Sequence, residues 1–228
     1  MSGMRESRRM ARVPVAVLIS GRGSNMRALV EAAQAQDYPA EIVAVISNRP
    51  DAAGIDWAKA QGIETAIIDH TNFESRAAFE AELHELLISY KTKLVACAGF
   101  MRIMTTDFVR RWEGRMINIH PSLLPAFKGL NCQENALAAG VKIAGCTVHY
   151  IIPELDSGPI IAQGAIAVEP QDTPASLAER ILSVEHRIYP LALKLVAGGD
   201  APLVNGKVML KTHVDSRFHL LSPGATTF

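Results

Sequence analysis

Short apolar runs alternate with longer helical patterns from Val13 to about residue 100, and this alternation constrains the fold more than any other feature. The apolar runs are rich in Val, Ile and Ala and occupy residues 13–20, 41–47, 64–69 and 93–99. The helical patterns between them cover residues 26–35, 51–62 and about 74–90. Near-continuous apolar strands separated by helices are typical of a parallel sheet with both faces covered. The sequence therefore predicts a Rossmann-like α/β half.

The pattern changes after about residue 100, where strands follow one another more closely. We predict strands at 115–120, 144–152 and 159–168, and a helix from about Pro174 to Ala197 with the proline in its first turn. The last two strands are close enough to pair antiparallel. Residues 203–210 predict a hairpin, because Asn205-Gly206 suits a type I′ turn. We therefore expect a mixed-sheet second half that shares one continuous sheet with the first.

The charge is balanced overall and uneven along the chain. Lys and Arg number 23 against 23 Asp and Glu, which offers no general attraction to a nucleic acid. Residues 1–12 hold four arginines and one glutamate, a local charge of +3 (4 − 1). We read residues 1–12 as a flexible basic tail, with a signal or transit peptide as the alternative. A single domain is expected over 13–211, divided at about residue 100, with a C-terminal extension over 212–228.

Neither a membrane span nor a disulfide framework is predicted. No apolar stretch approaches the roughly 20 residues that a membrane helix needs. Three cysteines are an odd number and form no CxxC pair, which argues against both disulfides and a thiolate zinc site. These features favour a cytoplasmic protein without a structural metal.

A glycine-bearing loop, SGRGSN at residues 20–25, joins the first predicted strand to the first helix. Glycines allow a sharp turn, and the N–H groups and dipole of the helix start favour an anion such as phosphate. Met26 stands where the dinucleotide fingerprint GxGxxG needs its third glycine. We therefore predict phosphate binding rather than NAD binding, with a plain tight turn as the alternative.

Polar residues end the strand at 115–120, on the sheet edge where open α/β folds bind ligands. Asn118 and His120 are two residues apart, so their side chains share one face. A histidine can serve as general acid or base, and an asparagine amide can donate to an oxyanion. Asp156, in the turn ELDSGP, would orient the imidazole and favour its cation if it faced His120. The alternatives are that Asn118 caps the strand, that His120 is a buried histidine with its hydrogen bonds satisfied, and that Asp156 belongs to an ordinary turn.

The remaining candidates have weaker patterns. Five histidines lack metal-ligand spacing and are interpreted as surface or packing residues: His70, His84, His149, His213 and His219. Glu185 and His186 suit the polar face of the last helix. Ser24 and Ser122 lack a GxSxG elbow, which argues against a serine hydrolase.

Five motifs occur in a characteristic order: SGRGSN (20–25), AGFMRIM (98–104), NIHPSLLPAFKGL (118–130), VHYIIPELDSGPIIAQ (148–163) and EHRIYP (185–190). Together they closely resemble the folate-dependent phosphoribosylglycinamide formyltransferases. The resemblance implies a formyltransferase-type fold, with a Rossmann-like parallel half continuing into a mixed-sheet half. It also implies transfer of the formyl group of 10-formyltetrahydrofolate, a consumed cosubstrate, to the amine of glycinamide ribonucleotide in purine synthesis.

The resemblance carries roles to individual positions. The catalytic trio would be Asn118, His120 and Asp156. The phosphoribosyl substrate would be held by Gly23, Ser24, Asn25 and Glu185, so the polar-face interpretation of Glu185 is replaced. The folate would be held by Arg76, Met101, Arg102, Ile103, Met104, Asn118, Ile152, Pro153, Glu154, Leu155 and Asp156. In this scheme Arg76 binds the folate carboxylates, and backbone groups of residues 101–104 and 152–156 bind the pterin.

The implied reaction is direct attack of the amine on the formyl carbon, with Asn118 and protonated His120 stabilising the oxyanion. No metal is required. Three positions depart from the family pattern: Asn131 follows Gly129-Leu130 where a histidine is frequent, Leu182 replaces a polar residue, and Pro153 replaces an acidic one. We expect altered affinities rather than a lost reaction.

Three rivals remain at this point. A methionyl-tRNA formyltransferase would add a C-terminal domain, and a formyltetrahydrofolate deformylase would add an N-terminal domain and lack the SGRGSN loop. A non-catalytic folate or nucleotide sensor is the third. The partners we expect are small molecules, with no nucleic acid or membrane, for a monomer or homodimer.

Overall fold

The computed structural model describes residues 11–211 and Ser222. Residues 1–10 of the predicted tail, and the predicted extension apart from Ser222, lie outside the described residues, as do His213 and His219. Arg12, which we placed in the tail, donates from its guanidinium to the carbonyls of Tyr38 (3.1 Å), Ala40 (2.6 Å) and Ala33. This side chain therefore joins the start of the first strand to the end of the first helix and the start of the second strand.

The strands are β1 (Val13–Ile19), β2 (Ala40–Ser47), β3 (Thr65–Ile67), β4 (Leu94–Cys97), β5 (Met116–His120), β6 (Ile143–Tyr150) and β7 (Ile160–Ala167). The helices are α1 (Ser24–Ala33), α2 (Ala53–Ala60), α3 (Arg76–Ser89), α4 (Thr106–Arg111), α5 (Cys132–Ala138) and α6 (Pro174–Gly198). A short 3₁₀ turn covers His70–Asn72, and a hairpin is formed by β8 (Leu203–Val204) and β9 (Lys207–Val208).

Within the described residues, β1 to β7 form one sheet in the order β3-β2-β1-β4-β5-β6-β7. Neighbouring strands are parallel from β3 to β5, whereas β6 pairs antiparallel with both β5 and β7. The predicted parallel half, the mixed second half and the continuous sheet are therefore confirmed. The chain reverses its direction of winding between β1 and β4, and such a switch point is where open α/β sheets bind ligands.

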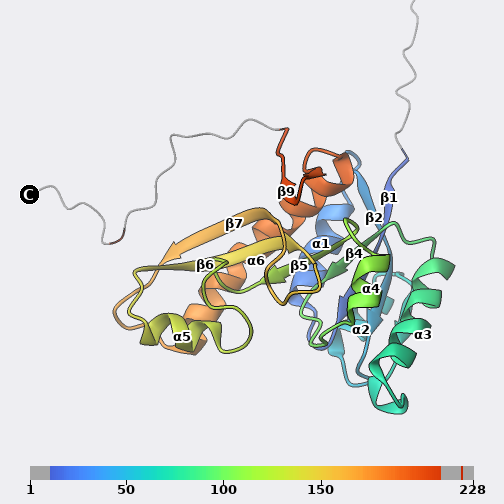
Figure 1. The fold of residues 1–228 in the computed structure, drawn as a ribbon, viewed down its shortest axis with the longest axis horizontal. Coiled ribbons are helices and arrows are strands. Elements are labelled where there is room, and N and C mark those ends of the chain that lie inside the picture. Colours follow the sequence, from blue (N-terminus) through green and yellow to red (C-terminus); the bar gives the residue numbers. More distant parts are fainter. Residues whose placement is uncertain (1–10, 212–221, 223–228) are drawn as a thin grey trace, which may run out of the picture.

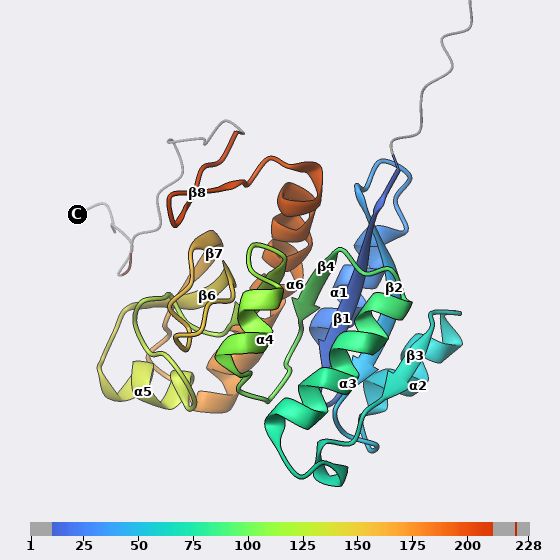
Figure 2. The same cartoon turned by 45° about the vertical axis from the view of Figure 1, so that its right-hand side comes forward.

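Helices cover both faces of the sheet (Figures 1 and 2). One apolar cluster joins β1 to α1, α2 and α6, and it includes Leu29, Ile55 and Leu193. The opposite cluster joins the sheet to α3 and α4 through Leu83 and Trp112, among others. Burial on both faces explains why the parallel strands consist almost entirely of apolar residues.

Helix α4 was not predicted. It has six residues, too few to show a helical period, and its start is marked by Thr105, whose hydroxyl accepts from the N–H of Phe108 at 3.3 Å. Glu80 of α3 is buried and accepts from the N–H of Thr105 at 2.7 Å. This contact fixes the residues just before α4, and those residues border the site described below.

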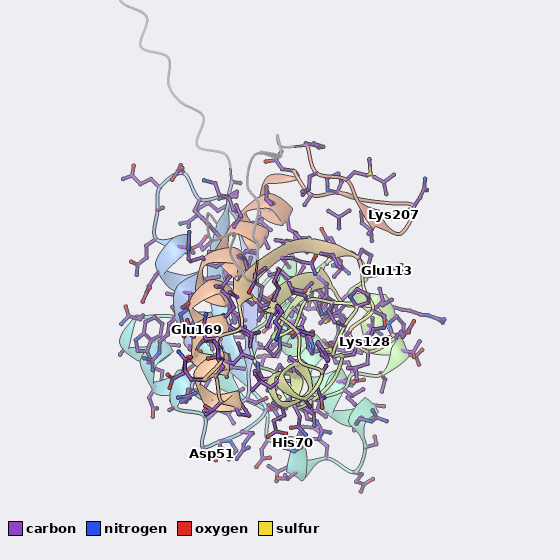
Figure 3. All side chains as sticks on the ribbon, turned by 90° about the vertical axis from the view of Figure 1, so that its left-hand side faces the viewer. Asp51, His70, Glu113, Lys128, Glu169 and Lys207 are labelled. Carbon is purple, nitrogen blue, oxygen red and sulfur yellow. The ribbon has the colours of Figure 1, made fainter. Side chains whose placement is uncertain are left out.

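The C-terminal elements agree with their local signals. Pro174 lies in the first turn of α6 beside a capping box formed by Thr173 and Ser176. Asn205 and Gly206 have φ of +50° and +74°, as the predicted type I′ turn requires. Figure 3 shows Lys207 of this hairpin at the opposite end of the molecule from Asp51 and His70. Among the described residues, no helix combines the length and apolar character needed to cross a membrane.

Candidate active site

A pocket of about 720 Å³ lies at the carboxyl ends of β4 and β5. Its wall is completed by residues 99–104, Val109 of α4, residues 129–133, His149 on β6, and residues 151–156. Asn118, His120 and Asp156 all line it. Strand order thus brings together residues that are up to about 60 positions apart in the chain.

His120 is held from both sides. Its Nδ1 lies 3.3 Å from the Oδ2 of Asp156, and its Nε2 lies 3.0 Å from the carbonyl oxygen of Phe127. Both partners are acceptors, so only the doubly protonated ring can donate to both at once. His120 and the Asp156 carboxyl are nearly buried, with side chains 6% and 9% exposed. The arrangement is suited to an oriented imidazolium.

Both residues that supply these acceptors have a left-handed backbone conformation. Phe127 has φ of +52° and Asp156 has φ of +47°. Non-glycine residues rarely adopt positive φ, and a bulky aromatic does so least readily. The N–H of Gly129, itself at φ +78°, donates to Asp156 Oδ2 at 2.9 Å. Two strained loops therefore meet at the His120 imidazole.

Asn118 has a partner that sequence reasoning missed. His149 lies opposite it in the antiparallel β5–β6 register, and Asn118 Nδ2 is 3.3 Å from His149 Nε2. Sequence reasoning interpreted His149 as a surface or packing residue; it is packed, at 3% exposed, and it also lines the pocket, which the interpretation did not include. Only the register of β6 against β5 could have indicated this, and sequence does not specify that register.

Cys132 is a second residue that sequence reasoning did not place in the site. Its thiol lies 3.4 Å from His120 Nε2 and 3.2 Å from the carbonyl oxygen of Gly129. Burial is the main cause that raises the pKa of Cys132, and the nearby Asp156 carboxylate adds to it. The group is therefore a neutral thiol packed against the imidazole.

The SGRGSN loop lies outside this pocket. Gly23 precedes α1 with φ of +71°, and a Cβ there would lie 2.8 Å from the Met26 methyl and 3.3 Å from Gly54 Cα. No side chain caps the start of α1, and its first turn holds no acidic residue. The N–H groups that begin at Ser24 thus remain suited to an anion.

Asn25 and Glu185 connect this loop to the last helix. Asn25 Nδ2 donates to Glu185 Oε2 at 2.6 Å, and both residues are buried. Burial raises the pKa of Glu185, while the Asn25 hydrogen bond and the nearby His120 charge partly offset that rise. Asn25 Oδ1 is buried without a hydrogen-bond partner in the described structure. The predicted substrate residues therefore lie close together, and Glu185 is near enough to His120 for the two to interact electrostatically.

The segment 101–104 forms an apolar rim. Met101 and Ile103 are 71% and 62% exposed, and Arg102 and Met104 also line the pocket. The Met101 N–H donates to Ser20 Oγ at 2.8 Å, which ties this rim to the carboxyl end of β1. Arg76 is not part of the lining, but its guanidinium donates to the carbonyl of Ile103 at 3.4 Å.

The loop 152–156 forms the facing wall. Leu155 is 52% exposed, and Ile152, Pro153 and Glu154 also line the pocket. Lys128 Nζ donates to Ser157 Oγ at 2.6 Å and joins this loop to the one after His120. The three departures from the family pattern lie in different places. Asn131 lines the pocket just before α5, and Pro153 is an exposed part of this wall. Leu182 is half-buried on α6.

Comparison with known proteins places the chain among formyl transferases. The formyl transferase family model matches residues 13–193. The trifunctional purine biosynthetic protein adenosine-3 of Bos taurus is 49% identical over 195 residues, 85% of this chain, which spans 19% of that protein. The phosphoribosylglycinamide formyltransferase of Escherichia coli is 40% identical over 185 residues, covering 81% of this chain and 87% of that one.

A solved structure of a related protein has the same fold. The crystal structure of glycinamide ribonucleotide transformylase 1 from Symbiobacterium toebii superimposes with a TM-score of 0.85 at 42% identity, covering 87% of this chain and 94% of that one. The predicted formyltransferase-type fold is thereby confirmed.

Proposed function

The chain belongs to the formyl transferase family, and we propose that it transfers the formyl group of 10-formyltetrahydrofolate to the amine of 5-phosphoribosylglycinamide. The products are formylglycinamide ribonucleotide and tetrahydrofolate, in purine biosynthesis. The observation that carries the proposal is the convergence of Asn118, His120 and Asp156 on one pocket, beside a helix start suited to phosphate. Relatives named for this reaction match most of the chain and most of their own length.

We assign the two substrates to different halves of the domain. The phosphate of the ribonucleotide lies at the start of α1, on Gly23, Ser24 and Asn25, where backbone N–H groups and the helix dipole attract an anion. Glu185 accepts from the ribose. Its carboxylate is buried beside Asn25, as a hydroxyl-binding acceptor near the phosphate would be.

The folate is assigned to the pocket between the two apolar walls. The exposed side chains of Met101, Ile103 and Leu155 suit a flat aromatic ligand, and backbone groups of both walls supply polar contacts. Arg76 and Arg102 supply positive charge at the 101–104 rim for the folate carboxylates. The volume of about 720 Å³ lies within the roughly 300–1,000 Å³ of small-molecule sites.

The transfer then proceeds by addition and elimination. The ribonucleotide amine forms a bond to the formyl carbon, and the formyl oxygen takes up the electron pair of its double bond. Asn118 and the His120 imidazolium stabilise this oxyanion. A proton moves from the attacking nitrogen to N10 of the folate, the C–N10 bond breaks, and an amide is left on the ribonucleotide.

Asp156, whose Oδ2 lies 3.3 Å from His120 Nδ1, holds the imidazole in this orientation throughout. In the described structure the Nε2 hydrogen of His120 is used by the Phe127 carbonyl at 3.0 Å. We propose that this hydrogen leaves Phe127 and turns to the oxyanion when substrates bind. The residues that follow His120 would then have to move slightly in each turnover.

Purified protein and 10-formyltetrahydrofolate, with and without the ribonucleotide, test this function. Tetrahydrofolate should appear only when the ribonucleotide is present, in equal amount to the formylated product. Release of tetrahydrofolate and free formate without the ribonucleotide would identify a deformylase instead. Tight binding without turnover would identify a sensor.

A further inference from the structure

We infer that His149 is a positioning residue: as a neutral imidazole that carries its hydrogen on Nδ1, it fixes the orientation of the Asn118 amide for oxyanion stabilisation. This inference deepens the proposed function and rests on it, because it concerns one of the three groups assigned to the reaction.

The first step concerns the Nδ1 atom of His149. It lies 2.9 Å from the carbonyl oxygen of Tyr150. A carbonyl can only accept, so Nδ1 must carry the hydrogen. Gly158 packs over this contact, since a Cβ on that residue would lie 1.7 Å from the Tyr150 oxygen and 3.3 Å from His149 Nδ1. The backbone of Gly158 thus lies close to the Nδ1 side of the ring.

The second step concerns the charge of the ring. His149 is 3% exposed, and burial is the main cause that lowers its pKa. The hydrogen bond to the Tyr150 carbonyl raises that pKa in part. Among the described residues, the charged or titratable groups that act on it are Asp156 of the following loop, which raises it, and His120 of β5, which lowers it. With Nδ1 protonated and the ring neutral, Nε2 has a free lone pair.

The third step follows for Asn118. Its Nδ2 lies 3.3 Å from that lone pair, so the amide must present its NH₂ group, and not its oxygen, to His149. One N–H is then used by His149, and the second stays free for the oxyanion. An imidazolium at His149 would demand the opposite orientation and would place the Asn118 oxygen on the ring. His149 therefore decides which end of the amide serves the reaction.

The adjacent histidine has the opposite environment. Both nitrogens of His120 face acceptors, the Asp156 carboxylate at 3.3 Å and the Phe127 carbonyl at 3.0 Å. Asp156 Oδ1 is 3.8 Å from His149 Nε2 and Oδ2 is nearer to His120. One carboxylate thus stands between a charged ring that stabilises the oxyanion and a neutral ring that orients the amide.

Nitrogen-15 NMR of the histidine side chains tests the protonation state without reference to activity. At pH 7.5, the His149 signal, assigned by its loss in His149→Gln, should show a protonated Nδ1 and an unprotonated Nε2. A protonated Nε2, in either the other tautomer or the cation, would overturn the inference even if the enzyme transfers formyl groups normally.

Kinetics of two variants test the role. His149→Phe keeps a flat ring and removes the acceptor, so kcat should fall by about tenfold or more, the scale of one oriented hydrogen bond, with both KM values within about twofold. His149→Gln places an amide oxygen near the former Nε2 and should recover most of the loss. His84→Phe, on α3 beside Trp112 and outside the pocket lining, is the matched control and should behave as the wild type.

Equal kcat in His149→Phe and the wild type, or no recovery in His149→Gln, would contradict the role. If His149→Phe does not fold, the comparison of His149→Gln with the wild type and the NMR result still decide. Absence of formyl transfer in the wild type would refute the proposed function alone and would leave the NMR test of His149 intact.

Discussion

His120 shows how much of a catalytic side chain's environment is set by backbone rather than by side chains. Of the two acceptors on its ring, Asp156 could be nominated from the sequence as a carboxylate in a motif, whereas the Phe127 carbonyl has no side-chain signature. The same holds for His149, since its place opposite Asn118 depends on strand register. Residue types that carry chemistry are visible in sequence, but backbone groups and cross-strand partners are not.

At the residue scale, Asp156→Asn separates charge from shape. Asparagine tolerates the φ of +47° and keeps the side-chain size, so the substitution removes the negative charge beside His120 and converts one acceptor oxygen into an NH₂ group. We expect kcat to fall by roughly 10²–10⁴-fold, the range for oriented acid–base groups, with little change in ribonucleotide affinity. Steady-state kinetics and equilibrium binding check this, with surface Asp51→Asn as the control. Equal losses in binding and turnover would contradict the assigned role.

Glu185 gives a second residue-scale prediction. Burial raises the pKa of Glu185, so its carboxyl group binds a proton more tightly in the folded state than in the unfolded state. Folding stability must therefore decrease as the pH rises from the usual glutamate value of 4.5 through the raised one. Glu185→Gln removes that penalty and should raise the melting temperature at pH 7.5 while weakening ribonucleotide binding.

The pH series identifies the cause. Below about pH 4 both forms are neutral, so the difference in melting temperature should vanish there. Glu179→Gln, an exposed position on the same helix, should show no such pH-dependent difference. A Glu185→Gln protein that is less stable than the wild type at neutral pH would contradict the account.

At the scale of elements, the site depends on loops that are held closely against strands. The loop after β6 can bring Asp156 to His120 because Gly158 lies directly against the end of β6. The 101–104 rim is held by Ser20 at the end of β1 and by the Glu80 contact at the start of α4. Sequence predicted the strands well because their apolar runs are continuous. It missed α4 because that helix is held by its contacts rather than by a periodic pattern.

Gly158→Ala tests the close approach of this loop. The added Cβ would lie 1.7 Å from the Tyr150 oxygen, so the loop must shift. We expect the free energy of unfolding to fall by about 1–3 kcal/mol, the usual cost of overpacking, and kcat to fall with it because Asp156 moves. Thermal and urea unfolding measure the first effect.

Gly198→Ala is the control for that substitution. Its Cβ would meet only the Asp200 carboxylate oxygen at 3.3 Å and Pro39 at 3.9 Å, both tolerable, at the end of α6. Stability of this variant should equal or exceed that of the wild type. Wild-type stability in Gly158→Ala would show that the loop is not held in this way.

At the scale of the whole molecule, β5 joins two kinds of sheet. It is parallel to β4 and antiparallel to β6, so one strand carries Asn118 and His120 at the boundary between the Rossmann-like half and the mixed half. Tyr189 of α6 donates to the carbonyl of Cys97 at 2.9 Å and so links the last helix to the end of β4. The placement of Asn118 and His120 at this boundary was predictable in outline from the sequence. The order of the elements and the position of these polar residues at the end of a strand already indicate it.

The central claim is that the trio moves a formyl group from folate to an amine, and isotope transfer tests it most directly. With carbon-13 in the formyl group of 10-formyltetrahydrofolate, a single turnover on bound 5-phosphoribosylglycinamide should place the label in the ribonucleotide amide. His120→Ala should slow that transfer by roughly 10²-fold or more while the ribonucleotide still binds. Label recovered as free formate, or transfer at the wild-type rate in His120→Ala, would contradict the account.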